Sequence, residues 1–531
     1  MPMPIIILTA LALLFRLATG GYYVIKPSLF VGTVSAMAIC LFLFCLRRDV
    51  RKPIEMPMLV IAVAMPVLAW SAPTLPLLFI AMCLWVPLAA GRFGLIVPVY
   101  LFSLLLLPGL DDTISIGSLK LVEFSVHDAL ALGAAAAIFV HPDKAKCRIE
   151  WDIIVLSVVL MISLAIARDT SISHHFRALA ETSLDLALPY YIVSRGLRTS
   201  DELRSSMLWL SAGGVVIAAL LIFEVWKAWP IYHELYRAFE LPTLLLVKVR
   251  AGMIRAGGPF VEPTSVAMVL AMCTLALYLS RDYFRNRRTY ILLMAVAVAG
   301  LIMPQSRGAW VGACIAIAAA DILRGHYAQF GRKVFLAGGA ISGLFLAAQF
   351  SPYLSETLGF SGGSTASSDY RRLLLNRGLE EFANRPILGH SMQELQPRLP
   401  DLVQGEGIID FVNAYIWIML IGGLVGLVLF LGPFVLFLIG IHRSGRFRGP
   451  KKRDVEAGVF VFGTLLMIME MLFFTSFGMT RPAFYQFALF GFAAAFLRLQ
   501  RKPDLAVLPA EPQEKPAPLA RTPGLAPLLS D

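Results

Sequence analysis

The sequence predicts an all-α protein, a polytopic membrane helical bundle of about 12–16 transmembrane helices with one large polar loop. Its 531 residues are 58% hydrophobic and only 15% charged, whereas soluble domains carry about 25% charged residues. Apolar runs recur along nearly the whole chain, separated by short polar connections. The longest interruption is the polar stretch 351–411, which is where a membrane protein of this kind would keep its chemistry.

The first half of the chain holds a series of apolar runs, and it begins with one that no basic residue precedes. A cleaved signal peptide usually has a positive leader, so we expect a retained first helix. The run 178–193 contains Glu181 and Asp185 and predicts a partial or re-entrant span, and polar loops are expected at 110–127 and 168–177. The remaining predicted spans are 5–17, 29–46, 58–70, 75–90, 93–107, 129–140, 153–167 and 206–226.

The second half gives clearer runs. The run 412–441 makes a helix of about 45 Å, longer than the ~30 Å hydrocarbon core, so we expect it to tilt or to kink near Pro433. About 14 spans result in all, if short apolar runs are counted as spans. The other predicted spans are 264–280, 290–303, 309–323, 334–350, 460–474 and 484–497.

These runs divide the chain into four regions. Residues 1–350 form a transmembrane region, 351–411 a periplasmic loop with partial helices, and 412–500 the last transmembrane helices. Residues 501–531 are rich in proline and predict a disordered cytoplasmic tail.

Lys and Arg residues gather in particular connections, which predicts the orientation in the membrane. Cytoplasmic loops carry an excess of these residues, so the basic groups and both termini are expected in the cytoplasm. The stretches 351–411, 168–177 and 227–258 then face the opposite side. The net charge of +11 follows from this topology, and we expect no nucleic-acid partner. The basic groups are 47–52, 144–148, 281–288, 324–333, 442–454 and 498–502.

Several cationic residues nevertheless fall on the side where this rule disfavours them. Arg307 lies in a short turn between two spans, where an ionisable group is costly and usually functional. Snorkelling to the headgroups is the alternative for Arg307, and a solvated loop surface is equally compatible with Arg371 and Arg372. The cationic residues on this side are Arg168, Arg177, Lys248, Arg250, Arg255, Arg307, Arg371, Arg372, Arg377 and Arg385.

Arginine clusters suit diphosphates, because the planar guanidinium donates two parallel hydrogen bonds and stays charged. Fixed arginines can stabilise a departing lipid-linked diphosphate without a metal ion. The sequence has no HExxH or DxD motif and no CxxC pair, and Asp111 and Asp112 fit a solvated loop better than a cation site. We therefore expect neither a metal nor another cofactor.

Four stretches resemble the O-antigen ligase and O-antigen polymerase superfamily of bacterial membrane proteins. They are IRAGGPFVEPTSVAM (254–268), PQSRGAWVG (304–312), RRLLLNRGLEEFANRPILGH (371–390) and VNAYIWIMLIGGLVG (412–426). The resemblance covers about residues 250–430. It implies a polytopic enzyme of the bacterial inner membrane that acts at the periplasmic face on undecaprenyl-diphosphate-linked glycans.

The chain departs from the family pattern at two positions. The ligases carry a His followed by Asn, Ser or Gln, then nine residues and Gly-x-x-Gly. Here Asn413, Gly423 and Gly426 keep that spacing, but Val412 stands at the His position. This leaves Asp410 or Glu406 as substitutes, or a mechanism without a strong base. For Gly422–Gly426 themselves, close helix packing of the GxxxG type is the favoured interpretation.

The second departure is Glu262, which replaces the first Asn of an Asn-Pro-Asn-like segment. For Asp410 the alternative to a chemical role is a helix N-cap. With these departures the resemblance implies substrate binding by Arg255, Glu262, Arg307, Arg371 and Arg372. It implies chemistry at Asp410, Glu406 and Asn413.

The function we predict is that of a metal-independent glycosyltransferase that polymerises undecaprenyl-diphosphate-linked repeats of an O-antigen or exopolysaccharide. The first alternative is a ligase that transfers the glycan to lipid A core or to protein. A polysaccharide or lipid exporter is a second, but transporters usually show two similar halves, which this sequence lacks. Expected partners are the lipid-linked glycan, membrane lipids, and assembly proteins such as a flippase or chain-length regulator.

Overall fold

The computed structural model describes residues 3–19, 21–117, 119–241, 247–358, 363–404, 407–444, 452–476 and 482–501. These residues form a helical bundle with two small β-hairpins, so the predicted all-α polytopic fold is confirmed. The predicted tail 501–531 lies outside the described residues except for Arg501, which ends the last helix.

The first half of the chain is mostly helical. Its helices up to the first hairpin are α1 (Met3–Ala18), α2 (Tyr22–Cys45), α3 (Arg48–Arg51), α4 (Glu55–Ser71), α5 (Leu75–Ala90) and α6 (Ile96–Leu106). The hairpin and the following helices are β1 (Asp111–Ile116), β2 (Leu119–Ser125), α7 (Val126–Val140), α8 (Ile149–Ala167), α9 (Ile172–Thr182), α10 (Leu188–Gly196) and α11 (Ser200–Lys227).

The second half is also mostly helical and contains the second hairpin. Its elements up to the large polar stretch are α12 (His233–Ala238), β3 (Val249–Arg250), β4 (Met253–Ile254), α13 (Pro263–Leu279), α14 (Arg287–Ile302), α15 (Arg307–Leu323) and α16 (Tyr327–Phe350). The remaining helices are α17 (Pro352–Leu358), α18 (Gly363–Asn384), α19 (Met392–Arg398), α20 (Ala414–Arg443), α21 (Lys452–Met471) and α22 (Pro482–Arg501).

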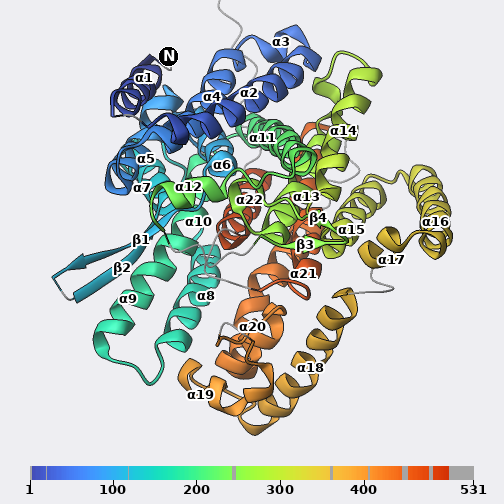
Figure 1. The fold of residues 1–531 in the computed structure, drawn as a ribbon. Helices are drawn as coiled ribbons and strands as arrows, with labels where there is room; N and C mark the ends of the chain where they lie inside the picture. The colour runs from blue at the N-terminus through green and yellow to red at the C-terminus, as the bar shows by residue number, and fades with distance from the viewer. Residues whose placement is uncertain are drawn as a thin grey trace, which may run out of the picture.

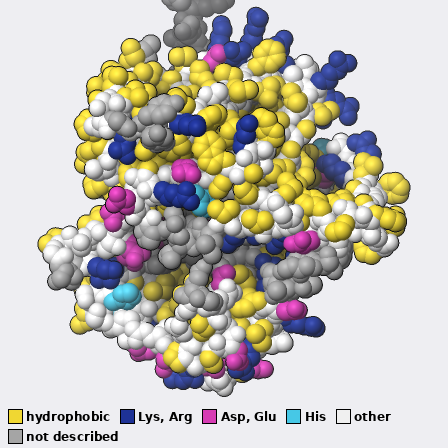
Figure 2. All heavy atoms as spheres, in the orientation of Figure 1, with side chains coloured by type: hydrophobic (Ala, Val, Ile, Leu, Met, Phe, Trp, Pro, Cys, Tyr) yellow, Lys and Arg dark blue, Asp and Glu magenta, His cyan; other side chains and the backbone are white. Residues whose placement is uncertain are grey.

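Helix α11 lies inside the bundle and organises it (Figure 1). It packs on α2, α6, α13 and α14, while α22 packs on α10, α20 and α21. Hydrophobic side chains dominate the outer surface of the upper part of the molecule (Figure 2), as expected for a bundle surrounded by lipid. Among the described residues, five helices are long and apolar enough to cross a membrane, namely 24–45, 149–167, 200–227, 327–350 and 414–443. Six shorter apolar helices accompany them, and the count of 12–16 spans stays a prediction.

The structure differs from the prediction at two stretches that we expected to be polar loops, 110–127 and 168–177. The stretch 110–127 contains the antiparallel β1–β2 hairpin. Apolar and polar residues alternate only near the turn, in 113–116 and 119–121, and Gly117 at the turn has a φ of 61°. The loop expected at 168–177 contains the start of α9, which Ser171 caps by accepting a hydrogen bond from the amide of His174. A π-helical segment, Ser183–Ala187, joins α9 to α10, so the weakly apolar run 178–193 is helical throughout.

Helix α20 breaks at Gly423 and not near Pro433, where we expected a kink. Gly423 has a φ of 63° and a ψ of −157°, a conformation essentially restricted to glycine. A Cβ at this position would lie 2.2 Å from the Ile387 carbonyl oxygen. The backbone that approaches Gly423 therefore belongs to the polar stretch and not to another helix. Gly422 and Gly426, the ends of the predicted GxxxG pair, do face a helix, since a Cβ at each would lie 3.4 and 3.5 Å from the Met161 sulfur of α8.

The segment 386–390 occupies the break and satisfies backbone groups that the break leaves unpaired. The amides of Leu424 and Val425 donate to the carbonyls of Pro386 (2.7 Å) and Ile387 (3.2 Å), and the amide of His390 donates to the carbonyl of Leu420 (2.6 Å). Arg168 holds the same segment by donating to the carbonyls at 388 and 389, at 2.8 and 3.0 Å. The polar stretch is thus built into a membrane helix.

The basic connections gather at one end of the bundle, here named the basic end, which comprises the loops at 47–52, 141–148, 195–204, 281–288 and 324–333. The amide of Arg47 donates to the Tyr283 carbonyl at 2.9 Å, and the guanidinium of Arg204 lies 5.2 Å from the Tyr283 ring. Figure 2 shows several Lys and Arg side chains together at this end, which carries α3 in Figure 1.

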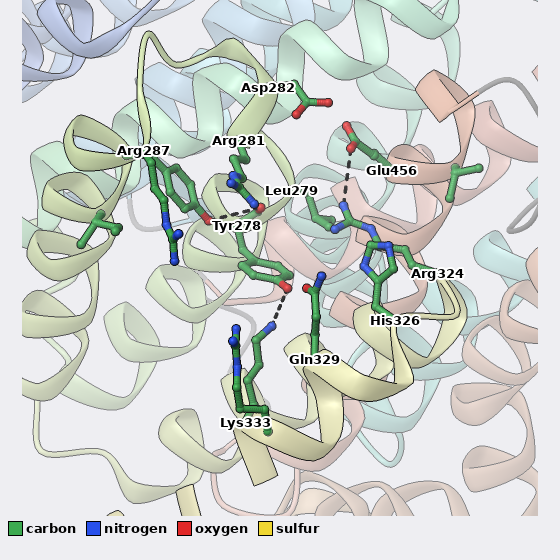
Figure 3. A pocket seen from close by; sticks show the side chains of 14 residues that line it. Tyr278, Leu279, Arg281, Asp282, Arg287, Arg324, His326, Gln329, Lys333 and Glu456 are labelled. Atoms are coloured by element: carbon green, nitrogen blue, oxygen red, sulfur yellow. Dashed lines mark hydrogen bonds and ion pairs between the residues drawn. The ribbon is translucent and has the colours of Figure 1, made fainter. Parts of the chain in front are cut away.

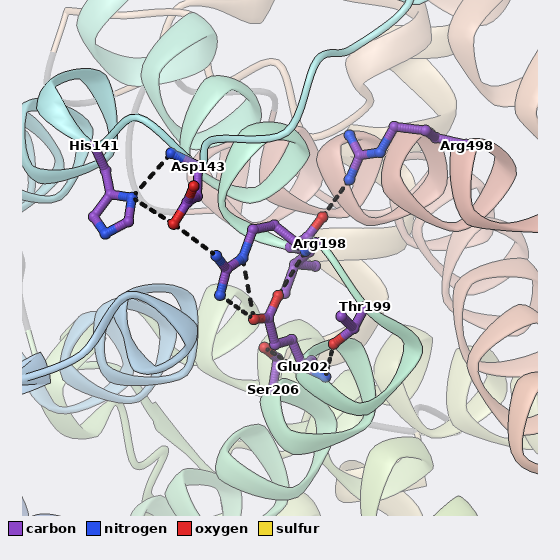
Figure 4. Close-up of polar contacts among 8 residues, drawn as sticks. His141, Asp143, Arg198, Thr199, Glu202, Ser206 and Arg498 are labelled. Carbon is purple, nitrogen blue, oxygen red and sulfur yellow. Dashed lines mark hydrogen bonds and ion pairs between the residues drawn. The ribbon is translucent and has the colours of Figure 1, made fainter. Parts of the chain in front are cut away.

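Polar contacts also tie the connections 141–148 and 195–204 to each other and to α22 at the basic end (Figure 4). Arg198 pairs with Glu202 at 2.9 Å and lies 3.9 Å from Asp143. Arg498 on α22 donates to the carbonyl of Ser194 at 2.6 Å. Helices α18 and α19 of the polar stretch lie at the opposite end of the molecule (Figure 1), as the predicted topology requires.

Candidate functional site

A cavity of about 790 Å³ lies on the side of the molecule away from the basic end, within the ~300–1,000 Å³ range of small-molecule sites. It is formed where the β3–β4 hairpin, α13, α15, α18 and α21 approach one another (Figure 1). Its charged lining residues are Lys248, Arg250, Arg255, Glu262, Arg307, Arg371, Asp410 and Glu470. The structure therefore brings five of the predicted site residues to one cavity, namely Arg255, Glu262, Arg307, Arg371 and Asp410.

The β3–β4 hairpin places Arg250 beside the cavity. Its two turn residues, Ala251 and Gly252, have φ values of 50° and 74°, as a two-residue hairpin turn with right-handed strand twist demands. The amide of Ala251 donates to the Glu356 carboxylate at 3.1 Å, which ties the hairpin to α17.

The turn before α15 receives two arginines. Arg250 donates to the carbonyl of Gln305 at 2.8 Å, and Arg255 donates to the carbonyl of Pro304 at 3.0 Å. The stretch 304–312 thus supplies carbonyls that orient the guanidinium groups of Arg250 in the hairpin and of Arg255 in the stretch 254–268.

Arg307 and Arg371 reach the cavity from two other elements. Arg307 is the first residue of α15, and it donates one hydrogen bond to the Leu358 carbonyl at 2.7 Å. The guanidinium of Arg371 lies 5.9 Å from the Phe474 ring, and its buried Nε has no hydrogen-bond partner among the described residues. Both side chains are half-buried, and in the described part of the chain each has guanidinium donors without a protein partner.

The cationic side chains repel one another across the cavity. The pKa of Arg250 is lowered to about 10, first by burial and then by three neighbouring guanidinium groups, those of Arg255, Arg307 and Arg371. Burial and then the charge of Arg307 lower the pKa of Arg371 as well. Burial and mutual repulsion destabilise this cluster of cations. A polyanion that enters the cavity therefore binds favourably, because it relieves both effects.

Two of the three carboxylates are held by specific partners. Glu262 caps α13 by accepting a hydrogen bond from the amide of Ser265, and it lies 3.6 Å from Lys248. Burial alone would raise the pKa of Glu262, but Lys248 and the amides of the first turn lower it below the ordinary value. Asp410 accepts a hydrogen bond from the Ser476 hydroxyl at 2.9 Å. The alternative reading of Asp410 as a helix cap is wrong, because Asn413 caps α20.

Glu470, near the end of α21, is the third carboxylate and was missed by the sequence reasoning. Both of its oxygens are buried without a hydrogen-bond partner in the described part of the chain. A single Glu near the end of an apolar run was the available signal, since charges inside such runs are costly and usually functional. Lys248 and Arg250 were noted for their position in the predicted topology but were not assigned to the site.

The other predicted residues lie elsewhere. Arg372 is exposed and does not line the cavity. The side chain of Asn413 accepts hydrogen bonds from the amides of Tyr415 and Ile416, at 3.0 and 3.2 Å, which is a capping role. Glu406 lies outside the described residues. Val412, at the position of the ligase His, lines the cavity.

The family comparison selects the same region of the chain. A family model described as O-antigen ligase matches residues 292–431, from α14 to the middle of α20. This range includes Arg307, Arg371 and Asp410. No curated protein matches the chain.

The match indicates a ligase- or polymerase-type enzyme of glycan transfer, with lipid-linked glycans and membrane lipids as its partners, in a multi-pass membrane protein. Residues 292–431 therefore match an O-antigen ligase domain, and over this range the comparison agrees with the predicted resemblance to the O-antigen ligase and polymerase superfamily.

Proposed function

We propose that the cavity transfers a growing glycan from an undecaprenyl-diphosphate carrier onto the next lipid-linked repeat, as an O-antigen or exopolysaccharide polymerase. The observation that carries this proposal is the group of Arg250, Arg255, Arg307 and Arg371 around one cavity that also holds carboxylates. Guanidinium groups bind phosphate oxygens in pairs of parallel hydrogen bonds, and a diphosphate offers several such oxygens.

The reaction is a single displacement at the anomeric carbon of the donor sugar. The acceptor hydroxyl oxygen forms a bond to this carbon while the bond to the diphosphate oxygen breaks. The leaving diphosphate takes the electron pair, and the arginine cluster stabilises the charge that develops on it. The acceptor proton passes to a carboxylate, for which Asp410 is our first candidate and Glu470 the second.

Asp410 is preferred because the Ser476 hydroxyl orients it and because its charge acts on Arg371. It therefore lies near the group that would hold the leaving diphosphate. Glu470 offers a carboxylate without a hydrogen-bond partner among the described residues, and a desolvated carboxylate is a stronger proton acceptor than a solvated one. Metal ions have no assigned role in this proposal, since the arginines supply the positive charge.

A ligase is the second candidate, and the description of the matching family favours it. Against it stands Val412, an apolar residue that lines the cavity where the ligases carry a His. Purified protein supplied with lipid-linked repeats as both donor and acceptor should form a ladder of longer lipid-linked products. Transfer of a single glycan to lipid A core or to protein, without a ladder, would replace polymerase by ligase.

The orientation in the membrane is part of the proposal. We place the basic end in the cytoplasm and the cavity at the periplasmic face of the bacterial inner membrane, on the excess of Lys and Arg at the basic end. An impermeant thiol reagent should label Asp369→Cys but not Arg48→Cys in intact spheroplasts of a strain expressing otherwise cysteine-free protein. Labelling of Arg48→Cys alone would invert the topology.

A further inference from the structure

A second cavity, of about 490 Å³, lies at the basic end and takes no part in the proposed reaction (Figure 3). It is formed by α13, α14, α16 and α21 together with the turn that joins α15 to α16. Its cationic lining residues are Arg281, Arg287, Arg324, Arg332 and Lys333, against the two carboxylates of Asp282 and Glu456. The cavity therefore carries an excess of positive charge.

One wall of this cavity is held rigidly. The Tyr278 hydroxyl donates to the fully buried Asp321 at 2.6 Å, and the Lys333 ammonium pairs with the same carboxylate at 2.6 Å. The ammonium also lies 4.3 Å from the Tyr278 ring centroid. Arg324 lies 3.6 Å from Glu456. These pairs fix the shape of the wall but leave other cations uncompensated.

Arg281, Arg287 and Arg332 line the cavity with exposed side chains, and no ion pair or side-chain hydrogen bond joins any of them to another residue of the described chain. Figure 3 shows Arg281 and Arg287 on one side of Tyr278 and Lys333 on the other, around a shared space. Three guanidinium groups and a positioned ammonium at one cavity are donors suited to a phosphate group.

The cavity opens beside apolar helix surface. Ile291 of α14 lines the cavity and is 51% exposed. Helix α16, which runs away from the cavity, has only Ala348 buried along its length and packs on α15 and α17. Its exposed residues beyond Lys333 include Val334, Phe335 and Leu336. A ligand with a phosphate and apolar chains fits this combination, whereas a free phosphate would leave the apolar surface unused.

We propose that this cavity binds the phosphate group of an anionic phospholipid from the membrane leaflet at the basic end, with its acyl chains along α14 and α16. Basic pockets between transmembrane helices are suited to such headgroups. The bound lipid would fill the space between α16 and the rest of the bundle. The competing explanation is that these arginines only face solvent as part of the orientation signal.

The test uses the full-length protein, delipidated in mild detergent, with dioleoylphosphatidylglycerol as the probe and dioleoylphosphatidylcholine as the neutral comparison. Native mass spectrometry counts retained lipids, and thermal melting measures stabilisation. We expect phosphatidylglycerol to bind and to raise the melting temperature, with a much weaker effect of phosphatidylcholine. The double variant Arg287→Gln/Arg332→Gln should bind phosphatidylglycerol at least about tenfold more weakly, as expected when charge-assisted hydrogen bonds are lost.

Arg288→Gln is the matched control, because Arg288 is exposed on the same turn of α14 and does not line the cavity. An equal loss of binding in Arg288→Gln would reduce the effect to general surface charge and overturn the proposal. Equal retention of phosphatidylcholine would overturn it too. Stabilisation by inorganic phosphate alone, equal to that by phosphatidylglycerol, would make this a site for free anions and not for a lipid.

Discussion

Replacing Asp410 by Asn tests which carboxylate accepts the proton of the acceptor hydroxyl. The Asp410 carboxylate accepts a hydrogen bond from Ser476 at 2.9 Å, and the amide oxygen of Asn can accept the same bond. Asn413, not Asp410, caps α20, so the helix start is untouched. We therefore expect Asp410→Asn to fold and to insert normally, with a melting temperature close to that of the wild type.

The expected effect is confined to the chemical step. General base catalysis contributes about 10²–10⁴-fold, so removing the base should raise the barrier by about 3–5 kcal/mol. The assay is polymer formation from lipid-linked repeats by purified protein, measured as initial rate at saturating substrate. Because an uncharged amide at this position leaves the arginine cluster intact, the substrate concentration for half-maximal rate should change much less than the maximal rate.

Two further variants make the result decisive. Glu470→Gln asks the same question of the second carboxylate. Asp401→Asn is the matched control, since Asp401 is an exposed carboxylate of the same polar stretch, paired with Arg377 at 3.0 Å, and does not line the cavity. A rate within about twofold of wild type in Asp410→Asn, with a severe loss in Glu470→Gln, would transfer the role to Glu470. Near-normal rates in both variants would refute proton transfer to either side chain.

Three other predictions follow from the same structure. Arg371→Lys keeps the charge but loses the paired donors, so it should slow polymer formation at least about tenfold, whereas Arg372→Lys at its exposed neighbour should be near neutral; equal effects would remove Arg371 from the diphosphate site. Gly423→Ala places a Cβ 2.2 Å from the Ile387 carbonyl in a strained conformation and should lower the free energy of unfolding by about 2–5 kcal/mol. Gly432→Ala should not lower it, since a Cβ at Gly432 would meet nothing outside the local helix backbone within 4 Å. Equal melting temperatures of Gly423→Ala and Gly432→Ala would contradict the break. The pKa of Glu262 is lowered in the folded protein, so its contribution to stability is present above the ordinary glutamate pKa and lost as the pH falls through the lower folded value. In thermal melts, wild type should therefore lose more stability than Glu262→Gln between about pH 5 and pH 3. Equal losses in the two proteins would contradict this prediction.

Much of this architecture could be predicted from hydropathy alone, because a bilayer demands long apolar helices. Arg255, Arg307 and Arg371 were also singled out, since Lys and Arg on the unexpected side of a membrane protein stand out against the orientation rule. Glu262 and Asp410 were singled out by the family resemblance. Their meeting in one cavity could not be read from the sequence, because it depends on how distant helices pack.

The features that sequence reasoning missed share a physical origin in tertiary contacts. Glu470 looked like one charge near the end of an apolar helix, and only the fold turns it toward the cavity. The break at Gly423 was placed at Pro433 because proline is the commoner cause of a kink. Glycine breaks a helix there only because the segment 386–390 supplies hydrogen-bond partners for the freed backbone groups.

Because the segment 386–390 is hydrogen-bonded into α20, chimeric proteins can be joined only at certain residues. The part of α20 before the break spans only the residues from Ala414 to Gly422, about 14 Å of helix. Its continuation across the break depends on carbonyls and amides contributed by residues 386–390. A chimera that exchanges the polar stretch with that of a relative should therefore join the two chains before residue 386 or after residue 426, so that the segment and the helix it completes are inherited together.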